Sequence, residues 1–70
     1  MAKPDQIMTP KEAAKYLKLS YEFLERDRWT ARAGGHLPRI PYAKIGSQVR
    51  YKLSDLDAFI EFSMVGAKPN

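Results

Sequence analysis

Two short segments near the start of the chain carry apolar residues at helical spacing, and a capping residue precedes each. In the first segment, Thr9 can cap a helix, Pro10 suits the first helical position and Glu12 completes a capping box. The pattern predicts a helix over about residues 10–17. Its predicted buried face holds Ala13, Ala14 and Leu17.

A second helix is predicted to begin at Tyr21, with Ser20 as its cap, and to run to about Ala31. Gly34 and Gly35 then stop the helical pattern. Two helices joined by so few residues are typical of a helix-turn-helix, although a generic helical hairpin fits the spacing equally well.

Apolar and cationic residues alternate around Gly46 and Ser47, which predicts a β-hairpin over residues 42–52. A two-residue turn would mix both kinds of residue on each face, whereas a three-residue loop at 46–48 separates them. We therefore predict the three-residue loop. Its apolar face would hold Ala43, Ile45, Val49, Tyr51 and Leu53, and its other face Tyr42, Lys44, Arg50 and Lys52.

In this register Lys44 pairs with Arg50, and like charges directly opposite each other destabilise a ladder. Lysines on an exposed edge strand can instead serve to prevent aggregation. We favour an anion as the partner of the cationic face, because protection of the edge does not offset the repulsion.

A third helix is predicted after the hairpin, with Ser54 as its cap, Asp57 completing a capping box and Gly66 as its stop. Its buried stripe would hold Leu56, Phe59 and Ile60. Seventy residues form one domain at most. The pattern predicts a mainly α domain with a small β-hairpin over residues 7–65, between tails at 1–6 and 66–70.

The composition argues against several classes of protein. There is no cysteine and one histidine, which excludes disulfides and argues against a zinc site or histidine-based catalysis. No nucleophile–base pair or phosphate-binding loop is visible, so we expect no enzyme activity, cofactor or metal. No apolar run approaches the ~20 residues of a membrane span, and no signal-peptide pattern opens the chain. We expect a cytoplasmic, nucleoid-associated protein.

The charge is segregated along the chain. The formal net charge is +4, and the surplus is concentrated between residues 26 and 52, where Asp27 is the acidic residue. The cations of that segment are Arg26, Arg28, Arg32, Arg39, Lys44, Arg50 and Lys52. The segment from Leu53 onward is acidic. Such segregation indicates a polyanionic partner rather than a device for solubility alone.

The second predicted helix has two different faces at 100° per residue. The outer face holds Tyr21, Glu22, Glu25, Arg26, Trp29 and Arg32; the core face holds Phe23, Leu24, Asp27 and Ala31, with Arg28 at the boundary. In a DNA major groove, Arg26 can pair with guanine and Glu22 can accept from cytosine. Arg28 and Arg32 are better placed for phosphates.

Three residues of this helix need a separate explanation. Glu25, like Glu22, would face a polyanion, either to disfavour wrong sequences or merely as a solvated residue. Trp29 is predicted to pack under the hairpin or the connector, because tryptophan is usually largely buried. Asp27 needs a partner on the core side, and Arg28 or a backbone amide can provide it.

The order helix, turn, helix, basic hairpin, helix resembles the excisionase-like helix-turn-helix family, which is related to the MerR-type winged helix. The matching residues are Met8 to Ala14, Leu17, Leu19, Ser20, Leu24, Ile40 to Tyr42, Lys44 to Gly46, Val49 to Tyr51 and Ser54 to Ile60. In that family the second helix enters the major groove and the hairpin wing touches the backbone or minor groove. Two departures are Phe23, where the family often has threonine, and a longer segment between Arg28 and Pro41.

The resemblance implies a non-catalytic protein that binds double-stranded DNA, either an excisionase-like architectural factor or a small phage-type transcription regulator. The candidate residues are Tyr21, Glu22, Arg26, Arg28 and Arg32 in the recognition helix and Lys44, Ser47, Gln48, Arg50 and Lys52 in the wing. Phe62, Met64 and Val65 are candidates for self-association or for contact with a recombinase or another protein. The alternative function is a protein-interaction module without a DNA role.

Overall fold

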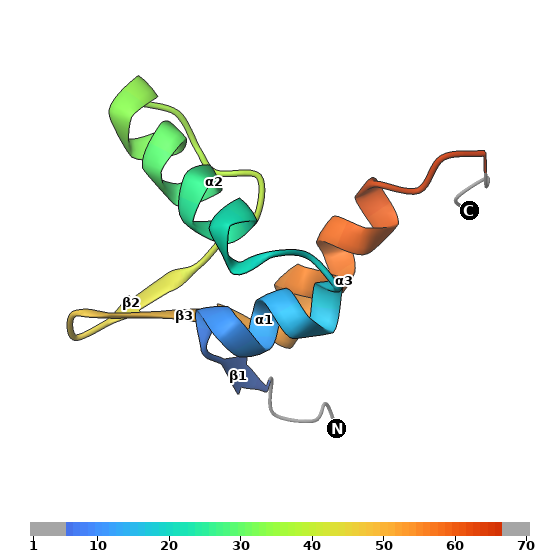
Figure 1. Ribbon diagram of the computed structural model, residues 1–70, viewed down its shortest axis with the longest axis horizontal. Coiled ribbons are helices and arrows are strands. Elements are labelled where there is room, and N and C mark those ends of the chain that lie inside the picture. Colours follow the sequence, from blue (N-terminus) through green and yellow to red (C-terminus); the bar gives the residue numbers. More distant parts are fainter. Residues whose placement is uncertain (1–5, 67–70) are drawn as a thin grey trace.

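The computed structural model describes residues 6–66 as three helices and a three-stranded antiparallel sheet (Figure 1). The elements are β1 (Ile7–Met8), α1 (Pro10–Leu17), α2 (Tyr21–Gly34), β2 (Ala43–Ile45), β3 (Gln48–Lys52) and α3 (Leu53–Phe62). The predicted fold class is confirmed. The predicted tails, apart from Gln6 and Gly66, lie outside the described residues.

Helices α1 and α2 begin at the predicted residues because side chains satisfy their first free amides. The Thr9 hydroxyl accepts from the Glu12 N–H at 3.2 Å, and the Glu12 carboxylate accepts from the Thr9 N–H at 2.9 Å. The Ser20 hydroxyl accepts from the Phe23 N–H at 3.2 Å. Helix α2 runs past the predicted end at Ala31 and stops where Gly35 takes a left-handed conformation, φ 70°.

The hairpin register differs from the prediction. Ile45 pairs with Gln48, Lys44 with Val49 and Ala43 with Arg50, so the turn has two residues, Gly46 and Ser47. The predicted three-residue loop is therefore wrong. Lys44 and Arg50 are not opposite each other, and the repulsion that favoured an anionic partner does not exist.

The core explains the observed register. Strand β1, which was not predicted, pairs Met8 with Tyr51, and both side chains are buried. Tyr42 lies on the same face, with its ring centroid 6.1 Å from that of Tyr51. The hairpin tip extends beyond the body of the protein (Figure 1), and Ile45 is 56% exposed there. Only the base of the hairpin has a core to cover, so mixed faces are tolerated near its tip.

The core lies where α1, α2, α3 and the sheet meet. Its buried members are Met8, Ala13, Ala14, Leu24, Ile40, Tyr51 and Leu56. Helix α3 begins at Leu53, before the predicted cap at Ser54, and it packs through Leu56 and Phe59, while Ile60 is exposed. Asp57 accepts a hydrogen bond from the Tyr16 hydroxyl of α1, and this bond raises the pKa of the Tyr16 phenol.

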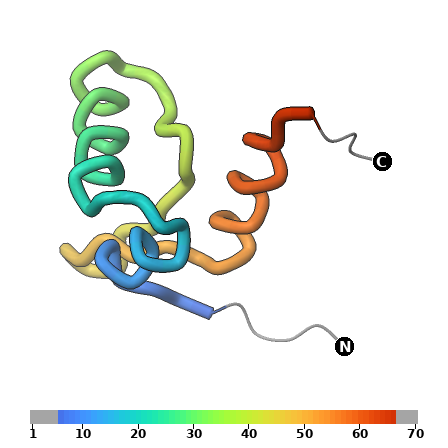
Figure 2. Tube along the Cα trace, turned by 45° about the vertical axis from the view of Figure 1, so that its right-hand side comes forward, coloured from blue at the N-terminus to red at the C-terminus, as the bar shows by residue number. Residues whose placement is uncertain are grey.

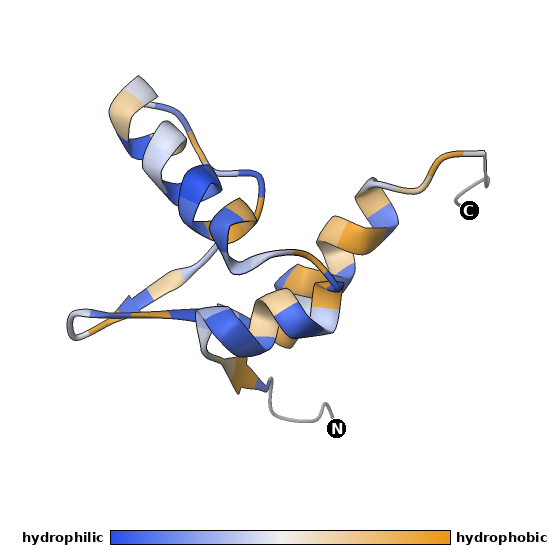
Figure 3. Ribbon diagram, viewed as in Figure 1, coloured by the Kyte–Doolittle hydropathy of each residue, from blue (hydrophilic) through white to orange (hydrophobic). Residues whose placement is uncertain are grey.

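Helices α2 and α3 point away from the core on separate sides of the molecule (Figure 1 and Figure 2). The middle of α2 is mainly hydrophilic and its last turn is mixed, whereas the far end of α3 is largely hydrophobic (Figure 3). At that end Phe62 is 92% and Val65 is 94% exposed. Of the candidate protein contact, Phe62 and Val65 are therefore almost uncovered, and Met64 is about half exposed.

The connector between α2 and β2 is held by Asp27. Its two carboxylate oxygens accept from the N–H groups of Arg39 at 3.0 Å and Ile40 at 3.1 Å. Backbone amides thus provide the partner that the sequence analysis required. Because Ile40 is buried in the core, this pair of bonds fixes the point where the chain returns toward the hairpin.

We predict that Asp27→Ala lowers the free energy of unfolding by about 1–3 kcal/mol, since two amides lose their acceptor. Asp27→Asn, which keeps one acceptor oxygen, should lose less. Urea unfolding followed by circular dichroism measures both. Equal midpoints for the wild type and Asp27→Ala would show that the connector does not depend on this carboxylate.

Candidate nucleic-acid interface

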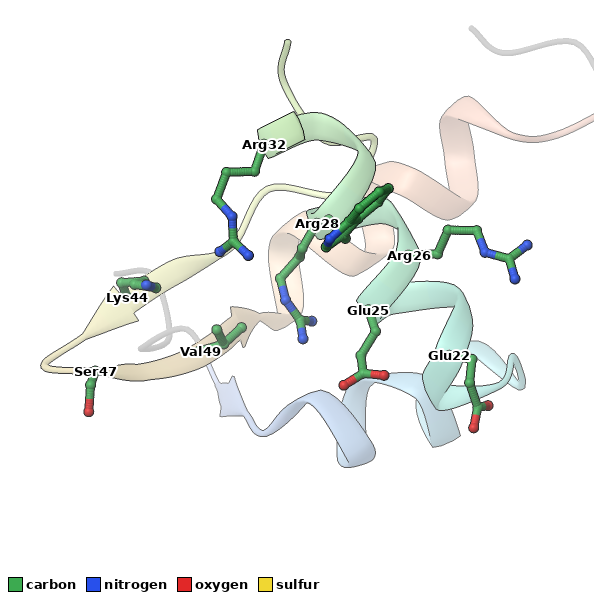
Figure 4. Close-up of a pocket in the computed structure, with 9 residues that line it drawn as sticks. Glu22, Glu25, Arg26, Arg28, Arg32, Lys44, Ser47 and Val49 are labelled. Atoms are coloured by element: carbon green, nitrogen blue, oxygen red, sulfur yellow. The ribbon is translucent and has the colours of Figure 1, made fainter. Parts of the chain in front are cut away.

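An open groove of about 600 Å³ lies between α2 and the hairpin, and cationic side chains from both elements line it (Figure 4). They are Arg26, Arg28 and Arg32 of α2 and Lys44 of β2. Arg28 and Arg32 extend toward the hairpin, whereas Arg26 extends to the opposite side of α2 (Figure 4). Cations from two elements therefore face one concave surface, with Ser47 of the turn at its edge.

Arg28 links α2 to the sheet. Its Nη1 donates to the Tyr51 hydroxyl at 2.8 Å, and its guanidinium lies 5.8 Å and 6.0 Å from the ring centroids of Tyr42 and Tyr51. Burial raises the pKa of the Tyr51 phenol, and the bond from Arg28 acts in the opposite direction. The phenol therefore stays neutral at physiological pH and accepts the bond. Besides lining the groove, Arg28 sets the position of the hairpin relative to α2.

The predicted wing residues do not share one face. Lys44 and Ser47 line the groove, whereas Gln48 and Arg50 line a second hollow that also contains Tyr21 and Lys11. Lys52 lies opposite Ile7 in the sheet. The predicted single cationic face of Lys44, Arg50 and Lys52 is wrong, because in the observed register Lys44 projects to the other side.

Lys11 was missed in the sequence analysis. It stood among the lysines on the polar face of the first helix, and its position in the sequence does not separate it from its neighbours. In the structure the second hollow brings it together with Arg50 and Tyr21. The two hollows share Arg28 and Val49, so they adjoin each other on the surface.

This arrangement can be compared with known proteins. Residues 7–63 match the model of a protein family described as a helix-turn-helix domain. The chain belongs to this helix-turn-helix family. Membership indicates DNA binding, and the family is of a non-enzymatic type. Neither the curated proteins nor the solved structures gave a match to the chain.

The helix-turn-helix comprises α1, a turn through Lys18 and Leu19, and α2. Lys18 caps α1 in a left-handed conformation, φ 57°, and its N–H and that of Leu19 donate to carbonyls of α1. This tight turn lets α2 pack on α1 through Leu24, which leaves the opposite face of α2 open to the groove.

Two acidic residues also line the groove of the helix-turn-helix domain. Glu22 and Glu25 are exposed acidic residues of α2 (Figure 4). The negative charge of their carboxylates repels any anion. A polyanion that enters the groove must therefore offer hydrogen-bond donors to these carboxylates. The groove therefore differs from a uniformly basic surface.

The prediction for Trp29 is wrong. Its side chain is 63% exposed and lines the groove instead of packing under the hairpin or the connector. Among the residues that pack in the core or against it are Tyr42 from the hairpin and Ile40 from the connector.

Neither metal chemistry nor a membrane span is indicated within residues 6–66. No cluster of three or more histidine, cysteine, aspartate or glutamate residues is arranged there to hold a metal ion. None of the helices in this part of the chain has the length and apolar character needed to cross a bilayer.

Proposed function

We propose that this helix-turn-helix domain binds double-stranded DNA sequence-specifically, with the outer face of α2 in the major groove and the hairpin against the backbone. The observation that supports the proposal is the groove between two elements, which is lined by Arg26, Arg28 and Arg32 of α2 and by Lys44 of β2. Cations gathered on one concave face suit the phosphates on either side of a DNA groove.

Different residues serve different contacts in this proposal. Tyr21, Glu22 and Arg26 lie in the N-terminal half of α2, the part of a recognition helix that contacts base edges. Arg26 suits guanine and Glu22 suits cytosine. Phosphate contacts fall to Arg32, Lys44 and Ser47 in the groove and to Lys11, Gln48 and Arg50 in the second hollow. Lys52, two residues after Arg50 in β3, is a further candidate for such a contact.

Because the chain resembles excisionase-like proteins, we further propose that DNA binding is its whole activity. The protein would act as an architectural factor in the excision of an integrated element or as a small regulator of transcription. A single copy of this size covers little DNA, so we expect several copies on one site. The proposed contact between copies is formed by Phe62 at the end of α3 and by Met64 and Val65 after it.

We predict that duplex affinity falls steeply with salt and that Lys44→Ala and Arg50→Ala each lower the slope of log K against log salt concentration by about one. Each lysine or arginine that neutralises a phosphate releases about one counterion. Titration of a labelled duplex, selected by the wild type from a random pool, at four or five salt concentrations measures the slope.

Lys15→Ala is the matched control. Lys15 is an exposed lysine of α1 that lines neither hollow, so its removal should leave the slope unchanged. A wild type that binds no duplex at low salt would contradict the proposal. Equal slopes in all three variants would contradict the assignment of Lys44 and Arg50 to phosphates.

A further inference from the structure

The exposed indole of Trp29 is the feature of the groove that DNA binding through cations does not explain. It is the one tryptophan of the chain, and it is 63% exposed. No aromatic ring among residues 6–66 packs against it. Exposed tryptophans are characteristic of binding surfaces, because a large apolar area of the ring stays in contact with water until a partner covers it.

The position of Trp29 indicates what covers it. It follows Arg26 by three residues and precedes Arg32 by three, so on the surface of α2 the indole lies between these two side chains. Lys44 of the hairpin lines the same groove. If Arg32 and Lys44 meet the phosphates of a duplex and Arg26 meets a base edge, the indole between Arg26 and Arg32 also faces the bases.

The chemistry of the indole restricts the contact further. It offers one N–H donor and a broad apolar face, so it cannot make the bidentate hydrogen bonds that distinguish guanine or adenine. The major groove presents one apolar feature, the 5-methyl group of thymine. We propose that Trp29 is a specificity-determining residue that recognises thymine through this methyl group. The inference rests on the proposed function and adds to it a base that none of the cations can select.

The test replaces each thymine of the selected duplex singly with deoxyuridine, which removes the methyl group alone. The wild type should lose about three- to five-fold in affinity at one or two of these positions, the effect of one buried methyl group. Trp29→Ala should bind thymine and uracil duplexes equally, with the salt slope of the wild type. Trp29→Phe should keep most of the discrimination, since it retains an apolar ring.

Leu37→Ala is the control, because Leu37 is an exposed apolar residue of the connector that does not line the groove. Leu37→Ala should distinguish thymine from uracil duplexes as the wild type does. Far-UV circular dichroism checks that each variant is folded. Binding should also change the fluorescence of the wild type, in which Trp29 is the sole tryptophan.

Two results would overturn the inference and leave the proposed function intact. One is a wild type that binds with the expected salt slope but shows no effect of deoxyuridine at any thymine. The other is an equal loss of affinity in Trp29→Phe and Trp29→Ala, with neither variant distinguishing thymine from uracil duplexes. That result would assign the indole N–H to a phosphate. A wild type that binds no duplex would instead refute the proposed function itself.

Discussion

Leu24→Ala is expected to lower the free energy of unfolding by about 2–5 kcal/mol. Leu24 is fully buried in α2 and belongs to the cluster that joins this helix to α1, α3 and the sheet. Truncation removes apolar contacts and leaves a cavity that a small core cannot collapse around. A domain of this length has a stability of roughly 3–10 kcal/mol, so the variant should lose a large fraction of its stability.

Thermal and urea unfolding followed by circular dichroism measure the effect. Leu37→Ala is the matched control, because it makes the same chemical change at a side chain that is 88% exposed. It should stay within about 0.5 kcal/mol of the wild type. Similar midpoints for the two variants would show that the cluster around Leu24 does not hold the domain together.

Local signals account for what the sequence predicted well. The starts of α1 and α2 depend on Thr9, Glu12 and Ser20, which bond to amides three residues away at most. The faces of α2 follow from helical periodicity, which correctly separated the buried Leu24 and Ala31 from the outer residues. Neither inference required knowledge of the rest of the fold.

The hairpin register depended on information that is not local. The predicted three-residue loop places apolar and cationic residues on different faces. This prediction assumed that one whole face of the hairpin is buried. The structure buries only the base of the hairpin, where β1 brings Met8 opposite Tyr51. Strand β1 has two residues, too few for any periodic pattern to reveal it.

In the candidate site, too, some features follow from local sequence and others depend on the packed fold. Arg26, Arg32 and Lys44 line the groove as expected of exposed cations on their elements. Trp29 was placed wrongly because average burial says little about one residue on an outer helical face. The partner of Arg28 is 23 residues away, so only the packed fold reveals that this arginine bonds to Tyr51.

Arg28→Ala should reduce duplex affinity by about 10- to 100-fold, more than the removal of one phosphate contact. The variant loses a charge-assisted hydrogen bond to the buried Tyr51 and the stacking of the guanidinium near two rings. Such contacts contribute about 1.5–3 kcal/mol. Without them the hairpin is no longer fixed against α2, so contacts made by both elements weaken together.

Tyr51→Phe separates this positioning role from charge, because it removes the hydroxyl and leaves Arg28 in place. It should weaken binding several-fold and lower stability with the salt slope unchanged, since no cation is lost. Arg32→Ala is the comparison: it removes a cation from the same groove and should reduce the slope by about one without loss of stability. If Tyr51→Phe binds and unfolds as the wild type does, the hydrogen bond from Arg28 does not fix the hairpin against α2, and other contacts must do so.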